Sequence, residues 1–157
     1  MRDDLKQDYT RRITSANKSQ LVVILYDMFD QYLNDAKESI NVNNFPDLHT
    51  EIRRARNVLS ELIISLDMKY EVSGNLYSVY RYIERLLIKA DIKRISEPID
   101  EARRLMGKLG DSFREVAKTD TDSPIMKNTE AVFAGITYGR EDVNENAFTG
   151  SNRGYLV

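Results

Sequence analysis

The side chains that could carry out chemistry in this sequence are few and scattered. His49 is the single histidine, and there is no cysteine, so neither a thiolate nucleophile nor a thiolate metal ligand is available. The chain has no Glu-x-x-His pair of the kind that holds a di-metal centre in a helical bundle. It also has no glycine-rich phosphate loop and no Ser-His-Asp order. The sequence therefore predicts a protein that is not an enzyme and that needs no metal or cofactor.

The charge balance argues against nucleic acid as a partner. Lys and Arg number 23 and Asp and Glu number 25, a net charge of −2, which offers little excess positive charge for phosphate contacts. The densest basic run, Arg53, Arg54 and Arg56, is interpreted as a solvated helix face. No window approaches the roughly 18 apolar residues of a membrane span, so we expect no membrane insertion. The N-terminus lacks the apolar stretch of a secretory signal.

Four stretches of the chain carry apolar residues at alternating steps of three and four, the pattern of helices packed nearly parallel to their neighbours. They run from Leu21 to Ala36, from Leu48 to Leu66, from Val72 to Ala90 and from Ile95 to Val116. The links between them are short, which makes consecutive helices antiparallel. The sequence predicts an all-α protein with an antiparallel up-down four-helix bundle over residues 17–118.

The two ends of the chain differ in texture from the bundle. Residues 1–16 are expected to form a flexible N-terminal segment. Residues 119–157 are expected to be a mostly irregular C-terminal extension, with a short helical turn from about Asn128 to Ala134. This extension has six acidic and three basic residues, yet Val132, Phe133 and Ile136 make it more apolar than a purely solvating tail.

Some large apolar side chains fall outside the expected core stripes. At 100° per residue, Ile64 points away from the stripe of its helix, whereas Val23 and Tyr26 lie far around theirs. Single exposed apolar residues are common, but surplus apolar faces on three helices favour a partner site, most naturally for an amphipathic helix. The predicted partner-binding residues are Val23, Tyr26, Ile64, Tyr77, Tyr80, Leu87 and Ile88.

Three short motifs carry a resemblance to a known family. They are Leu25-Tyr26-Asp27, Ser65-Leu66-Asp67-Met68, and Asn75-Leu76-Tyr77 leading into Tyr80 and Tyr82. With the helices around them, over roughly residues 5–118, the chain resembles the flagellin export chaperones of the FliS family. Two departures stand out. Ser15-Ala16-Asn17-Lys18 replaces the usual Thr-Ala-Ser-Pro run, with Asn17 still able to cap a helix, and Met28 stands where many members have Gly.

The resemblance implies a cytoplasmic, non-enzymatic chaperone. Such a protein holds the C-terminal segment of flagellin as helices wrapped around an antiparallel bundle, prevents premature polymerisation and assists delivery to the flagellar export gate. The resemblance also implies an N-terminal lid that covers part of the groove until the ligand arrives. In this chain the lid would include Leu5, Tyr9 and Ile13.

Two other functions stay open on the sequence alone. The apolar faces could be buried by self-association of a structural bundle that has no flagellin client. The protein could also be a regulatory adaptor that uses its own C-terminal extension as ligand. In that extension Val132, Phe133 and Ile136 are a second candidate for covering the groove.

Overall fold

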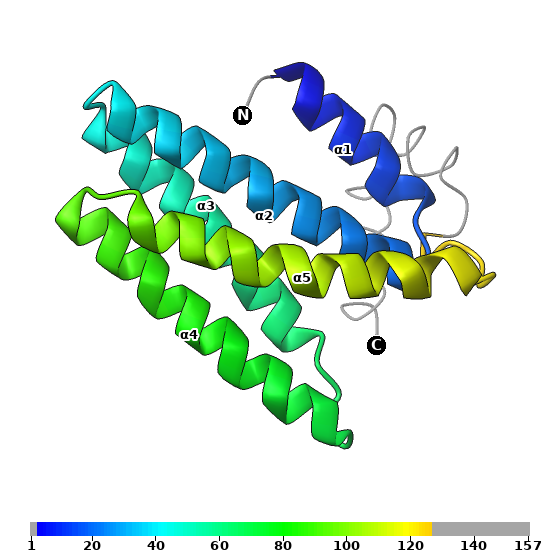
Figure 1. Ribbon diagram of the computed structural model, residues 1–157. Helices are drawn as coiled ribbons and strands as arrows, with labels where there is room; N and C mark the ends of the chain where they lie inside the picture. The colour runs from blue at the N-terminus through cyan, green and yellow to red at the C-terminus, as the bar shows by residue number, and fades with distance from the viewer. Residues whose placement is uncertain (1–2, 127–157) are drawn as a thin grey trace, which may run out of the picture.

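The computed structural model describes residues 3–126, and this part of the chain is all helical, without a strand (Figure 1). The all-α prediction is therefore confirmed. The described helices are α1 (Asp3–Ser15), α2 (Lys18–Asn41), α3 (Phe45–Ile64), α4 (Glu71–Lys93) and α5 (Glu97–Thr119). The expected turn from Asn128 to Ala134 lies outside the described residues.

The prediction of a flexible N-terminal segment is wrong, because the structure has a fifth helix there. α1 has Asp3 and Asp4 in its first turn and Arg12 in its last, and both charges favour a helix through its dipole. A helix of 13 residues is marginal by itself in water. Packing against α2 must therefore supply part of its stability.

Helices α2 to α5 follow one another in alternating directions (Figure 1). α2 packs against α3 and α5, and α4 packs against the same two helices, while α1 lies along the outer side of α2. In Figure 1 the first half of α4 diverges from the second half of α5. As a result α2 has helices on three sides, whereas α4 keeps an open flank.

Local sequence signals fix where the helices begin and end. The Asn17 side chain accepts a hydrogen bond from the Gln20 backbone N–H and the Gln20 side chain bonds back, which makes a capping box at the start of α2. At the start of α3 the Asn44 side chain accepts a hydrogen bond from the Asp47 backbone N–H, and Pro46 lies in the first turn. At the other ends Asn43 and Arg94 take positive φ angles of 56° and 59°, the left-handed conformation that stops a helix.

Five of the six residues of the predicted core stripe of α3 are buried as expected, whereas the sixth, Leu66, lies beyond the end of α3 and is half-buried. Leu48, Ile52, Ala55, Leu59 and Leu62 are each at most 1% exposed. They pack with buried side chains of α2, α4 and α5 in one continuous core. The largest side chains buried from those helices are Phe29, Leu33, Tyr80, Ile83, Leu87 and Ile99.

The core face of α4 differs from the stripe that the sequence suggested. We expected Val72, Leu76, Val79, Ile83, Leu86 and Ala90. The buried residues are instead Ser73, Tyr80, Ile83, Leu87 and Ala90, with Val72 60% exposed. Both sets obey steps of three and four once Leu76 is counted in each, so spacing alone cannot decide between them.

Two pairs of side chains set the register between α3 and α4. His49 Nδ1 lies 2.8 Å from Asp91 Oδ2, and Arg56 donates to Glu84 at 3.2 Å. Each pair is seven residues from the other on its helix, so both lie on one side of the contact. Continuing this antiparallel register places Ile64 opposite Leu76 and beside Tyr77.

A candidate partner-binding surface

Exposed apolar side chains gather on α4 and on the link that leads into it. Of the twelve large hydrophobic residues that are exposed in the described chain, eight lie between residues 64 and 92. We call these eight the α4 surface: Ile64, Met68, Tyr70, Val72, Tyr77, Tyr82, Ile88 and Ile92. Clustering of this kind is typical of a protein-binding site.

Part of the predicted site falls on the α4 surface. Ile64 is 76% exposed, Tyr77 42% and Ile88 37%. Tyr77, Ile88 and Ile92 share one face of α4 by helical geometry, on the side where α3 brings Ile64. The predicted residues Ile64, Tyr77 and Ile88 are therefore exposed to solvent on the neighbouring helices α3 and α4.

The opposite flank of α4 faces α5 and is also apolar. Val72 is exposed there, and Leu76 and Val79 are half-buried at the edge of the core. The Arg85 guanidinium lies 5.7 Å from the ring centre of Tyr82. A partner helix lying along α4 would meet apolar side chains on either flank.

Three predicted partner-binding residues are misplaced: Tyr26, Tyr80 and Leu87 are at most 3% exposed and belong to the core. Tyr80 and Leu87 are buried because the face of α4 that packs into the core carries them, rather than the predicted stripe. Tyr26 is buried because α2 has neighbours on three sides, so even its far face is covered. The Tyr26 and Tyr80 hydroxyl groups form a hydrogen bond with each other, with an O–O distance of 2.6 Å.

The predicted lid residues lie together on the inner face of α1. Tyr9 is buried with Ala16 and Ile24 in a small apolar cluster, and Leu5 and Ile13 are half-buried against this cluster. Leu21 and Met28 of α2 complete this small cluster. α1 thus covers an apolar strip of α2 and leaves the α4 surface open. The role of α1 as a lid stays a prediction.

One carboxylate ties α1 to the rest of the molecule. Asp27 of α2 accepts hydrogen bonds from Arg12 of α1 at 2.6 Å and from Arg114 of α5 at 2.9 Å. The Arg12 guanidinium also lies 5.3 Å from the ring centre of Tyr9. The hydrogen bond to Asp27 raises the pKa of Arg114 above its ordinary value. Three helices therefore meet at Asp27.

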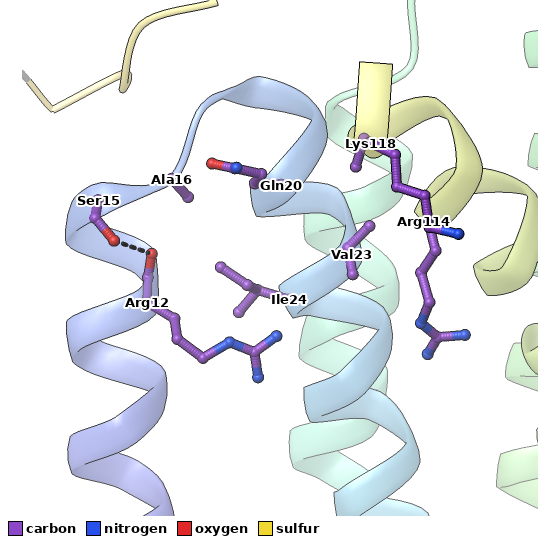
Figure 2. A pocket seen from close by; sticks show the side chains of 9 residues that line it. Arg12, Ser15, Ala16, Gln20, Val23, Ile24, Arg114 and Lys118 are labelled. Carbon is purple, nitrogen blue, oxygen red and sulfur yellow. Dashed lines mark hydrogen bonds between the residues drawn. The ribbon is translucent and has the colours of Figure 1, made fainter. Parts of the chain in front are cut away.

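Val23, the remaining predicted residue, lies in a separate groove between α1, α2 and α5. This N-terminal groove has a volume of about 420 Å³ and is lined by Arg12, Ala16, Val23, Ile24, Arg114 and Lys118, among others (Figure 2). Figure 2 shows Arg12 and Ile24 on one side of it and Arg114 and Lys118 on the other. Val23 is half-buried and shares no helix with the α4 surface.

The described residues offer little for catalysis or metal binding. No group of three or more His, Asp or Glu side chains among residues 3–126 could hold a metal ion. Across the same residues, no helix has the length and hydropathy needed to cross a bilayer. His49, the single histidine, is well exposed and engaged with Asp91.

Comparison with known proteins assigns this helical framework. The sequence model of a family described as flagellar protein FliS matches residues 1–120. The chain belongs to the FliS family. The resemblance read from the Leu25–Asp27 and Ser65–Met68 motifs is thus confirmed.

Two curated proteins agree with this assignment. The flagellar secretion chaperone FliS of Escherichia coli (strain K12) is 29% identical over 106 residues, which cover 66% of this chain and 78% of the relative. The flagellar secretion chaperone FliS of Bacillus subtilis (strain 168) is 20% identical over 108 residues, 69% of this chain and 81% of the relative.

The FliS match ends one residue beyond α5 and includes α1. The α4 surface and the contact of three helices at Asp27 therefore both lie within the residues that match the family. Sequence reasoning missed Met68, Tyr70, Val72, Tyr82 and Ile92 of the α4 surface and the three-helix role of Asp27. Asp27 contacts Arg12 and Arg114, which lie 15 and 87 positions away from it in the sequence. No local sequence pattern can indicate such contacts.

Proposed function

We propose that this protein is a flagellar secretion chaperone that binds the C-terminal segment of flagellin, prevents premature polymerisation and assists its export. Membership of the FliS family, in which two curated relatives are named flagellar secretion chaperones, is the observation that carries the proposal. The open apolar α4 surface supports it because a client that must stay unpolymerised needs its own apolar residues covered.

The chemistry of the α4 surface fits a helical client. Its side chains extend from Ile64 to Ile92, and Tyr77, Ile88 and Ile92 share the face of α4 on the side of Ile64. An amphipathic segment anchored at i, i+3, i+4 and i+7 could follow this face. Tyr70, Tyr77 and Tyr82 would add hydroxyl groups that can bond a client's polar atoms.

In this proposal α2 to α5 act as an antiparallel bundle that serves as the rigid platform. α1 is the lid, and it occupies the part of α2 to which a client helix would bind. Displacing α1 would expose Leu21, Ile24 and Met28 as a second apolar strip. A disordered client can wrap more than one such strip, because it orders only on binding. The chaperone works in the cytoplasm, is not an enzyme and hands its client to the flagellar export gate.

The test is a titration of the full chain with a peptide covering the C-terminal segment of the host's flagellin. We expect one-to-one binding with a gain of helical circular dichroism beyond the sum of the two components. If the peptide does not bind and the protein instead dimerises through the α4 surface, the self-associating bundle replaces the chaperone.

A further inference from the structure

The chain turns back after α5 and crosses the junction between α1 and α2. The Asn17 side-chain N–H₂ donates to the carbonyl oxygens of Asp120 and Asp122, each at 3.3 Å. Further on, the backbone N–H of Ile125 donates to the carbonyl oxygen of Ala16 at 3.0 Å. The described chain therefore ends, at Met126, against the α1–α2 turn.

This end point lies at the N-terminal groove, because Ala16 also lines that groove. The floor of the groove is apolar, with Val23, Ile24 and Ala117, and its rim is cationic, with Arg12, Arg114 and Lys118 among its lining residues. None of the residues that line it in the described chain is acidic. Arg12 and Arg114 both donate to Asp27, Arg114 also donates to Asp111, and Lys118 donates to Glu115. Because a guanidinium has five N–H donors, both arginines keep donors for a further acceptor.

We propose that residues 130–138 of this same chain, Glu-Ala-Val-Phe-Ala-Gly-Ile-Thr-Tyr, occupy the N-terminal groove. Phe133 and Ile136 would contact the apolar floor, and Glu130 would face the cationic rim. Phe133 is seven residues beyond Met126, a reach of at most about 25 Å. Because Ile125 already touches the groove wall, the segment needs no long excursion to enter it.

The groove suits such an occupant in size and in kind. Its volume of about 420 Å³ is in the range of pockets that receive small ligands or single anchoring side chains. A segment attached beside it meets a high effective concentration and binds without a new translational cost.

Disulfide trapping in the full-length chain tests the docking, because the natural sequence has no cysteine. The test variant pairs Ala117→Cys on the groove floor with Ala134→Cys in the segment, which keeps Phe133 and Ile136 in place. The control pairs Gly107→Cys with the same Ala134→Cys. Gly107 lies on α5 as well, is exposed, and a side chain there meets nothing within 4 Å.

We expect the intramolecular disulfide to form about tenfold faster in the Ala117 pair than in the Gly107 pair, because docking raises the local thiol concentration. Equal rates, or disulfides that form only between molecules, would overturn the proposal. If Ala117→Cys disturbs folding, the exposed lining residue Lys118→Cys takes its place with the same expected ratio. No flagellin is present, so failure here leaves the chaperone proposal standing, and failure of flagellin binding leaves this proposal standing.

Discussion

The hydroxyl groups of Tyr26 and Tyr80 lie 2.6 Å apart and form a buried hydrogen bond between α2 and α4. Both side chains are at most 3% exposed. Burial raises the pKa of both tyrosines, and Tyr80 adds to the effect on Tyr26. Two tyrosines that the sequence predicted to bind a partner therefore form a hydrogen bond inside the core.

The first prediction concerns the strength of this bond. Tyr80→Phe leaves the Tyr26 hydroxyl buried without its partner, so the free energy of unfolding should fall by about 1–3 kcal/mol. The double variant Tyr26→Phe, Tyr80→Phe removes both polar groups and should cost no more than either single change. Urea unfolding of the four proteins measures the coupling. Costs that simply add would show that the two hydroxyl groups do not depend on each other.

The second prediction is a loss of stability at alkaline pH. In the unfolded chain tyrosine ionises near pH 10, whereas the buried tyrosines stay neutral at higher pH because their pKa is raised. The unfolded state therefore releases protons first, and stability that is intact below about pH 10 declines as the pH rises above it. Each tyrosine contributes at most about 1.4 kcal/mol per pH unit in this window.

The double phenylalanine variant isolates this effect, because other groups titrate in the same range. Unfolding free energies at pH 9, 10 and 11 should decline less steeply in the variant than in the natural protein. Parallel declines would mean that Tyr26 and Tyr80 do not cause the alkaline sensitivity.

The sequence determined the core face of α3 but not that of α4. In α3 one row of apolar residues at steps of three and four stands against polar neighbours, so Leu48 to Leu62 could be identified as core. In α4 two such rows overlap at Leu76, Ile83 and Ala90. Only the position of α5 decides that Leu87 is buried and Val72 exposed. This difference in burial depends on tertiary packing, and the spacing of the apolar residues does not reveal it.

The fifth helix was missed for a different reason. α1 carries three large apolar residues at intervals of four, Leu5, Tyr9 and Ile13, with acids at its start and Arg12 at its end. Those signals were present in the sequence, but they are weak for a short helix whose stability comes from docking. The partner of Arg12, Asp27, is 15 residues away, and periodicity cannot reveal such a contact.

The third prediction tests α1 as a lid. Ile13→Ser removes a half-buried contact between α1 and α2 and should loosen α1, which hydrogen exchange of α1 amides would detect. If α1 covers its strip of α2 for nine-tenths of the time, uncovering it tightens peptide binding about tenfold, or about 1.4 kcal/mol. Gln7→Ser is the matched control, because Gln7 is exposed on the same helix. Faster exchange of α1 without tighter binding would show that α1 moves but is no lid.

The most direct test of the account concerns the α4 surface and its client. Isothermal titration of the full chain with the flagellin C-terminal peptide would compare the natural protein with Ile64→Asp and Tyr77→Ala. Ser112→Asp is the control, because it adds the same charge at an exposed position on α5 that is none of the eight residues of the α4 surface.

Ile64→Asp should weaken binding by about tenfold or more, because it places a charge where an apolar anchor is expected. Tyr77→Ala should weaken it in the same direction. Each substitution should change the unfolding free energy by less than about 1 kcal/mol, as is usual for exposed positions. Ser112→Asp should bind as the natural protein does. Unchanged affinity in both Ile64→Asp and Tyr77→Ala, with folding intact, would contradict the assignment of the α4 surface to flagellin.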